Sequence, residues 1–160
     1  MFVTSDQFKP DDFFGVEGAD AKCYAAAELR LAGTFKTWMA KDQNDPPNSR
    51  FTKSPKGYVR TDGVVVADSW DDLVDGNLKA PIDHDEFGEL VTTSTFVWSG
   101  ALADGFAFAP SGESTANCFG WSVSATGTGR AGDITKTNAQ WADVGAKDCS
   151  STLRVYCFEQ

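Results

Sequence analysis

The sequence has a single histidine, His84, and none of its four cysteines lies two residues from another. Structural zinc sites combine cysteine and histidine ligands at short spacings, so we expect no zinc centre. Ser–His–Asp and Cys–His catalysis would both depend on that one imidazole. His84 lies in the acidic segment 83–86, shortly after Pro81. This composition is typical of a solvated turn and not of a general base.

Motifs of other catalytic classes are also missing. The segment 120–124 reads Gly-Trp-Ser-Val-Ser and therefore lacks a Gly-x-Ser-x-Gly elbow. The glycines of segment 127–130 lack the Gly-Lys-Thr/Ser ending of a phosphate-binding loop, which favours a flexible loop there. Among 23 Asp and Glu residues some carboxylates lie close together by chance, so a glycosidase-like pair carries little weight. The sequence predicts a protein that is not an enzyme.

Positive charge and long apolar runs are both scarce. The chain has 14 Lys and Arg against 23 Asp and Glu, a formal net charge of −9. This balance disfavours nucleic acids and anionic membranes as partners, because binding to phosphates relies on Lys and Arg. No stretch approaches the roughly 18 apolar residues of a membrane-spanning helix, so we expect no membrane insertion. No export signal stands at the start, where residues 2–4 already read as a strand, so we expect a mature domain without its leader or lipid-anchor segment.

The chain does contain an aromatic-rich core and an even number of cysteines. Hydrophobic residues make up 41% and aromatic residues 12% of the 160 residues, which suits one globular domain over 1–160. The cysteines are Cys23, Cys118, Cys149 and Cys157. We expect two disulfides and therefore an oxidising location: secreted, periplasmic or on the cell surface. Spacing alone leaves all three pairings open.

Local patterns predict short helices and strands in a mixed order. The clearest helix is predicted from Asp20 to Leu31, with Asp20 as its N-cap and Cys23 facing the core. A second short helix opens at Ser69, which has capping-box spacing with Asp72. Strands are predicted at residues 2–4, 34–39, 63–67, 95–98, 118–123 and 152–158, with loops over 5–17, 41–56 and most of 101–147. This arrangement indicates an α+β fold.

Several short motifs in a fixed order resemble a known family. They are Gly18-Ala19-Asp20 with Cys23, Leu31-Ala32-Gly33-Thr34-Phe35, Ser69-Trp70-Asp71-Asp72-Leu73 with Gly76, Val97-Trp98-Ser99-Gly100, and the close at Cys149 and Leu153 to Glu159. Together they span nearly the whole chain, which resembles endostatin, the C-terminal domain of certain collagens. The tail from Val155 to Gln160 is similar to bacterial endostatin-like secreted proteins and lipoproteins, including a spirochaete outer-membrane group.

The resemblance implies a C-type-lectin-like fold with two helices, antiparallel sheets, paired termini and a long loop region. It also implies nested disulfides, Cys23–Cys157 and Cys118–Cys149. Endostatin builds its zinc site from histidines and its heparin affinity from clustered arginines, and this chain has neither. Calcium-dependent lectins of this fold use a Glu-Pro-Asn-type loop and a Trp-Asn-Asp triplet, of which only part survives at residues 141–143. Zinc is therefore not expected, and calcium stays an alternative that we do not favour.

The loop region from Asp104 to Lys147 is the predicted binding surface. Phe106 and Phe108 stand among small polar residues and are the main candidates for exposed apolar side chains. Trp121 and Trp141 resemble core positions of the family and would contact a ligand only if partly exposed. The predicted ligand-binding residues are Asp104, Phe106, Phe108, Glu113, Trp121 and Trp141, and a calcium ion would use Asp133 and Asp143.

The expected function is recognition of an extracellular macromolecule. Loops fixed on a disulfide-braced scaffold lose little entropy on binding, which suits an adhesin-like module with a protein or matrix partner. Two alternatives stay open. One is a carbohydrate-binding lectin, with or without calcium, and the other is a structural component of a surface assembly.

Overall fold

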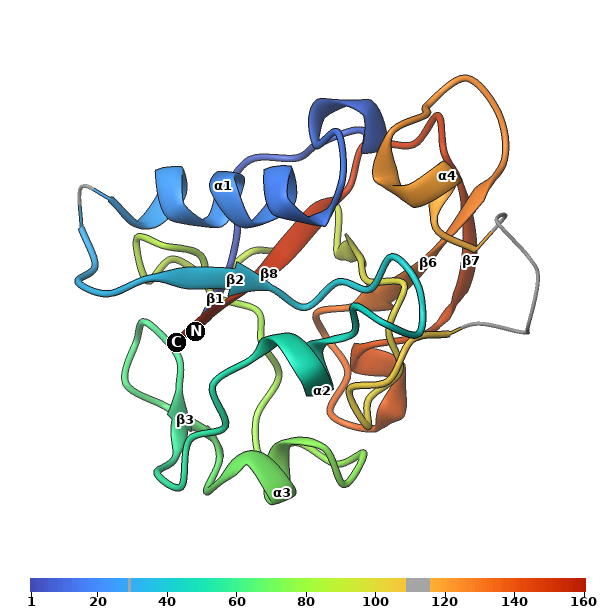
Figure 1. Cartoon of the computed structure of the whole chain (residues 1–160). Coiled ribbons are helices and arrows are strands. Elements are labelled where there is room, and N and C mark those ends of the chain that lie inside the picture. Colours follow the sequence, from blue (N-terminus) through green and yellow to red (C-terminus); the bar gives the residue numbers. More distant parts are fainter. Residues whose placement is uncertain (29, 109–115) are drawn as a thin grey trace.

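A six-stranded mixed sheet lies at the centre of the protein (Figure 1). The computed structural model describes residues 1–28, 30–108 and 116–160. The sheet runs in the order β1-β8-β5-β6-β7, and β2 also pairs with β8. Its strands are β1 (Phe2–Val3), β2 (Phe35–Thr37), β5 (Phe96–Trp98), β6 (Thr128–Asp133), β7 (Gly145–Asp148) and β8 (Arg154–Glu159). A separate ribbon pairs β3 (Tyr58–Val59) with β4 (Val65–Ala67).

Strand β8 has pairing partners on both edges. Its residues 154–158 are all buried. Strands β1 and β2 pair with it antiparallel, whereas β5 pairs with it in parallel through Val97 and Trp98. The prediction of purely antiparallel sheets is therefore wrong at β5, since the chain returns to β8 through the β6–β7 hairpin. The two chain ends lie side by side, as the resemblance implies (Figure 1).

Helix α1 (Val16–Ala27) begins four residues before its predicted start and ends before Leu31. Gly15, with a φ of 116°, precedes it, and Asp20 lies inside the helix. The Asp20 carboxylate accepts hydrogen bonds from the backbone N–H and the hydroxyl of Thr37, at 2.8 and 2.9 Å, and so fixes β2 against α1. The buried face of α1 consists of Val16, Ala19, Cys23 and Ala27. The inward orientation predicted for Cys23 is confirmed.

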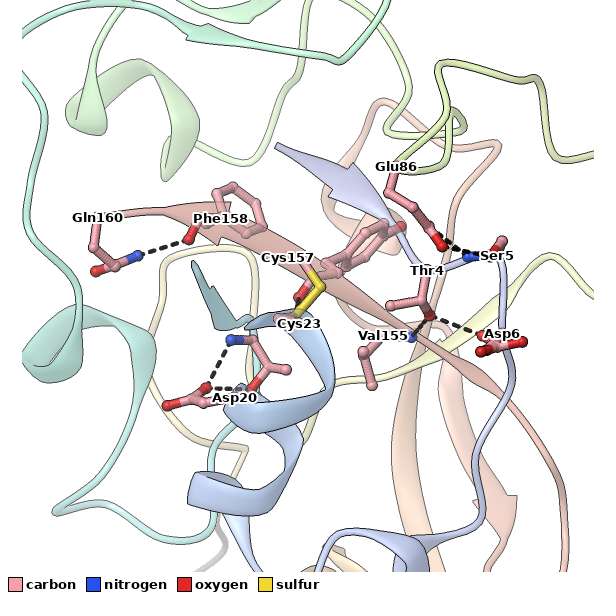
Figure 2. The surroundings of a disulfide bond; sticks show 12 residues. Thr4, Ser5, Asp6, Asp20, Cys23, Glu86, Val155, Cys157, Phe158 and Gln160 are labelled. Atoms are coloured by element: carbon pink, nitrogen blue, oxygen red, sulfur yellow. Dashed lines mark hydrogen bonds between the residues drawn. A yellow bond between two sulfur atoms is a disulfide. The ribbon is translucent and has the colours of Figure 1, made fainter. Parts of the chain in front are cut away.

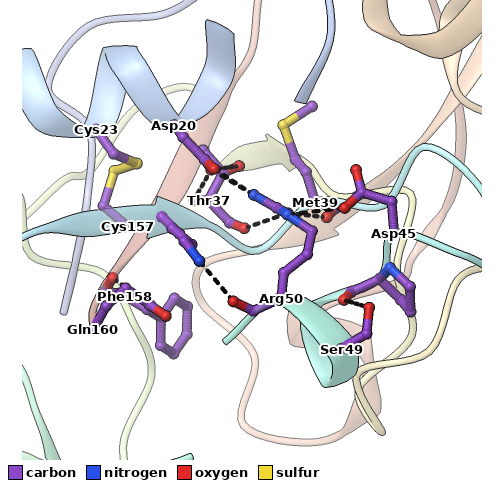
Figure 3. Close-up of polar contacts among 12 residues, drawn as sticks. Asp20, Cys23, Thr37, Met39, Asp45, Ser49, Arg50, Cys157, Phe158 and Gln160 are labelled. Atoms are coloured by element: carbon purple, nitrogen blue, oxygen red, sulfur yellow. Dashed lines mark hydrogen bonds and ion pairs between the residues drawn. A yellow bond between two sulfur atoms is a disulfide. The ribbon is translucent and has the colours of Figure 1, made fainter. Parts of the chain in front are cut away.

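Arg50 joins α1, β2 and the short helix α2 (Pro47–Arg50) (Figure 3). Its guanidinium donates to the two carboxylate oxygens of Asp20 at 2.7 and 2.6 Å and to the Met39 carbonyl at 2.7 Å. Asp45 lies 3.3 Å from Arg50 Nε. Burial raises the pKa of Asp45, and the Arg50 charge opposes this effect. These contacts explain how a helix forms in a segment whose sequence predicts a loop.

Helix α3 (Trp70–Leu73) starts at Ser69 as predicted. The Ser69 hydroxyl accepts a hydrogen bond from the N–H of Asp72 at 3.2 Å. The Asp72 carboxylate accepts from the N–H of Asp68 at 2.6 Å, so it does not complete the capping box with Ser69. Trp70 and Leu73 are buried, and Trp70 packs within 6.0 Å of Trp38 between ring centroids.

The second half of the chain contains regular structure where long loops are predicted. Strands β6 and β7 form an antiparallel hairpin, and a 3-10 helix, η2 (Ala139–Trp141), lies between them. Helix α4 (Cys118–Trp121) replaces the predicted strand at 118–123. All four residues of α4 have positive φ values, from 49° to 69°, so the segment is one turn of left-handed backbone. Asn117 caps this turn by accepting the N–H of Gly120 at 2.9 Å.

The prediction of an α+β fold is confirmed, although the helix count differs from the predicted two. The described residues contain four α-helices and two 3-10 helices, of which η1 (Pro10–Asp12) falls in a segment predicted as loop. No helix in the described part of the chain is long and apolar enough to cross a membrane.

Two disulfides hold the fold together. Cys23 is bonded to Cys157 and Cys118 to Cys149, with Cα–Cα distances of 5.4 and 5.6 Å. This is the nested pairing that the resemblance implies. The first bond joins α1 to β8 in the core (Figure 2), and the second joins α4 to the end of β7. All four cysteines are fully buried.

His84 lies in a network of charged side chains, which corrects the prediction of a solvated turn. Its Nδ1 is 2.8 Å from the Asp83 carboxylate and its Nε2 is 3.5 Å from that of Asp62. Arg60 donates to both aspartates, at 2.6 Å to Asp62 and at 2.5 Å to Asp83. The hydrogen bonds from Arg60 lower the pKa of Asp62 to about 2.

The lowered pKa of Asp62 predicts that the protein loses stability in acid. Its folded pKa lies below the ordinary value of 3.8, so the ionised group stabilises the fold above about pH 4. This contribution disappears as the pH falls through about 2. Asp62→Asn should therefore lower the melting temperature at about pH 6, and the two proteins should converge towards about pH 2. Thermal unfolding across this range measures the difference, and a difference that does not change with pH would contradict the prediction.

Candidate functional site

Residues 100–108 form a tight hydrogen-bonded turn. The N–H of Leu102 donates to the carbonyl of Phe106 at 2.8 Å, and the N–H of Gly105 donates to that of Leu102 at 3.0 Å. The Asp104 carboxylate accepts the N–H of Phe106 at 3.0 Å. Gly105 has a φ of 79°, which only glycine adopts without strain. The sequence predicts a loop at this position, and the structure shows one with a fixed backbone.

The turn is anchored on two sides. The N–H of Asn48, at the start of α2, donates to the carbonyl of Gly105 at 2.9 Å. At the base, the N–H of Phe108 donates to the carbonyl of Gly100, also at 2.9 Å. Gly100 has a φ of 60°, and a Cβ there would stand 2.4 Å from the carbonyl oxygen of Ala40. The turn therefore keeps its shape before any partner binds.

The two phenylalanines of the turn differ in environment. Phe106 is 55% exposed, as predicted. Phe108 is partly buried, and the guanidinium of Arg130 lies 3.8 Å from its ring centroid. Arg130 also forms a bidentate ion pair with Asp143, at 2.8 and 2.6 Å. Phe108 thus packs on an arginine–carboxylate pair beside the turn, so its predicted exposure is wrong, and Phe106 is the more exposed of the two rings.

A groove of about 330 Å³ runs beside the turn. It is lined by Val74, Asp75, Gly76, Leu102, Ala103, Asp104, Ala139 and Asp143. Two of its three carboxylates, those of Asp104 and Asp143, belong to the predicted site, and the third, that of Asp75, lies outside the predicted loop region. Arg130 neutralises Asp143, whereas Asp75 and Asp104 are exposed and each accepts a nearby backbone N–H. The groove therefore combines an apolar lining with negative charge.

Trp121 and Trp141 belong to the core. Both are fully buried. The indole N–H of Trp121 donates to the carbonyl of Ala40 at 2.8 Å, and Trp141 packs on Trp38 with ring centroids 4.8 Å apart. Neither ring offers a face to a ligand, which corrects their assignment to the binding surface and agrees with the core position that the family resemblance implies.

The predicted calcium ligands are engaged in other contacts. Asp143 is held by Arg130, and Asp133 accepts hydrogen bonds from the N–H and the hydroxyl of Thr135 at 3.0 and 2.8 Å. Among the described residues, no group of three or more His, Cys, Asp or Glu side chains is placed to hold a metal ion. Glu113, the remaining predicted ligand-binding residue, lies outside the described residues.

Sequence reasoning missed Arg130, because segment 127–130 reads as a flexible glycine-rich loop. In the structure most of this segment lies in β6. A Cβ on Gly129 would stand 3.0 Å from both Trp98 and Trp121, so the strand needs glycine there to pass the indole rings. Glycine is unfavourable in strands, so its presence in a sequence does not predict one. The need for glycine opposite the two indole rings is visible only in the structure.

No model of a known protein family matches the chain, and no curated protein matches it.

Proposed function

We propose that the protein is a non-catalytic, extracellular, adhesin-like module that binds a protein or matrix macromolecule through the turn at residues 100–108. The observation that carries this proposal is the position of Phe106, whose ring is 55% exposed on a turn with a fixed backbone. An aromatic side chain on a rigid support gains contact area at little entropic cost, as binding hot spots require. The acidic groove beside it would select partners with complementary charge.

The proposed fold is C-type-lectin-like and of the endostatin-like type. Its support is the pairing of the two chain ends, the nested disulfides, and the positions of α1 and α3 at the two helical motifs that resemble the family. The two buried disulfides also support a location outside the reducing cytoplasm, which we take to be secreted, periplasmic or on the cell surface.

A binding role needs no reactive group, and two observations support a non-catalytic role. All four cysteines are in disulfides, so none supplies a thiolate nucleophile. His84 lies between the carboxylates of Asp62 and Asp83 and is 17% exposed. We propose that the protein acts without a catalytic centre or a resident cofactor.

Phe106→Ser is expected to weaken binding to an immobilised matrix or serum protein by roughly 10- to 100-fold. The substitution removes the exposed ring, whereas the hydrogen bonds of the turn use backbone groups and the Asp104 carboxylate. The melting temperature should therefore hardly change. Interferometry against a panel of matrix and serum proteins, together with a glycan array with and without calcium, measures the effect.

Phe87→Ser is the matched control. Phe87 is 50% exposed, close to the value for Phe106, but it lies under the guanidinium of Arg30 beside α1. This control should bind as the wild type does. Equal binding by wild type and Phe106→Ser would contradict the proposal. Binding to glycans alone would select the lectin alternative, and no binding on either panel would favour a structural component of a surface assembly.

A further inference from the structure

Phe14 is the most exposed of the large hydrophobic residues in the described part of the chain, at 83%. Its φ is 55°, in the left-handed region. Bulky side chains rarely adopt this conformation, because the Cβ crowds the neighbouring carbonyl oxygen. A ring that buries so little surface does not offset that strain. Backbone strain of this kind, at a side chain the fold does not use, points to a role outside the fold.

Phe119 has the same two properties. Its φ is 57° and it is 44% exposed. It lies in α4, which is joined to the segment of Phe14 because the N–H of Gly15 donates to the carbonyl of Trp121 at 3.1 Å. Figure 1 shows the segment around η1 and α4 side by side at one end of the molecule. Phe14 and Phe119 thus stand on adjoining segments, and we call the surface that these two segments form the Phe14–Phe119 patch.

The backbone under the patch is held firmly. Phe13, next to Phe14, is only 2% exposed and anchors the segment in the core. The disulfide between Cys118 and Cys149 ties α4 to the end of β7. The hydroxyl of Ser124 joins the two segments by donating to the Asp11 carboxylate at 2.5 Å. The two exposed rings are therefore preorganised, which reduces the entropy lost on binding.

Carboxylates border the patch. Asp11, Asp12 and Glu17 are exposed, and none forms an ion pair with any residue that the structure describes. Two cations lie beside these segments: Lys9, and Lys41, whose Cε would stand 3.3 Å from a Cβ on Gly120 in α4. The three carboxylates therefore outnumber them. A second copy of this chain would bring like charges together at this surface, which opposes association. A partner with Lys or Arg around an apolar centre would complement it.

We propose that the Phe14–Phe119 patch is a second interaction surface, which binds a protein partner whose apolar side chains are flanked by Lys or Arg. This surface is distinct from the turn at residues 100–108 and does not rest on it. The two rings provide the apolar contact, and the three carboxylates provide charge selectivity.

Stability measurements separate this role from a structural one. Asn and Gly tolerate the left-handed conformation better than Phe does, so Phe14→Asn and Phe14→Gly should melt at the wild-type temperature or above it. A ring needed for packing would give the opposite result. A clear fall in melting temperature in both variants would therefore overturn the proposal.

The binding probe is a labelled amphipathic peptide of Leu and Lys, about 18 residues long, or five helical turns. Its counterpart carries Glu in place of Lys. Fluorescence anisotropy should show binding of the Leu–Lys peptide to the wild type, and Phe14→Asn should weaken it at least about tenfold. Because Phe14→Asn keeps every charge, unspecific attraction to the acidic chain would leave its affinity unchanged. Phe106→Ser should bind this peptide as the wild type does, which keeps the two surfaces distinguishable.

Two further outcomes would overturn the proposal. The first is equal affinity of wild type and Phe14→Asn for the Leu–Lys peptide, or equal binding of the Leu–Glu peptide. The second is a concentration-dependent dimer, seen by analytical ultracentrifugation for the wild type and lost in Phe14→Asn. That dimer would assign the patch to a second copy of this chain.

Discussion

Replacing Cys23 and Cys157 together by alanine is expected to lower the free energy of unfolding by about 5 kcal/mol. The two residues are separated by 134 positions, so the bond closes nearly the whole chain into one loop. Without it the unfolded chain gains the entropy of that loop. The loss is as large as the entire net stability of many domains. Denaturant titration followed by tryptophan fluorescence, in buffer without reductant, measures it.

The second disulfide provides the control. Cys118 and Cys149 are separated by only 31 positions, and their double alanine variant should lose about 3.5 kcal/mol. Both pairs are fully buried, so loss of packing in the core is similar in the two variants. The difference between them therefore reports the loop lengths. An equal loss in both variants, or a larger loss for the shorter loop, would show that the loop entropy of the unfolded chain does not explain the stabilisation.

Much of the fold follows from local patterns in the sequence. The last strand, the inward face of Cys23 and the capping of α3 by Ser69 are all set by residues close to one another along the chain. The predicted start of α1 is wrong because Asp20, judged from its neighbours in sequence, is a good N-cap. Its carboxylate instead binds Thr37 and Arg50, which are far away in sequence. Tertiary partners override a local preference here.

The candidate site was predictable only in part. Phe106 stands out because its neighbours are small and polar, and the structure exposes it. Arg130 and Asp75 join the site through packing between distant segments, which spacing cannot show. The exposure of Phe14 depends on a left-handed backbone, and the sequence shows only two adjacent phenylalanines, Phe13 and Phe14. Which ring enters the core is decided by the turn into α1.

That turn leads to a prediction that runs against helix propensity. Gly18 lies in the first turn of α1, where alanine would ordinarily stabilise a helix by about 1 kcal/mol. A Cβ on Gly18 would stand 1.6 Å from the carbonyl oxygen of Phe13. Because that atom belongs to the backbone, no rotamer change relieves the overlap. Gly18→Ala is therefore expected to destabilise the protein by about 3 kcal/mol.

Ala25→Gly in the same helix separates propensity from packing. Ala25 is exposed, so its replacement should cost only the backbone term of about 1 kcal/mol. Denaturant titration should thus show losses for both changes, although they are opposite substitutions, with the larger loss for Gly18→Ala. To make room for the new methyl group, Phe13 must move, and Phe14 must move with it. Gly18→Ala should therefore also weaken binding of the Leu–Lys peptide, whereas Ala25→Gly should not. A gain in stability for Gly18→Ala would mean that α1 and Phe13 do not make the close contact that holds Phe14 outward.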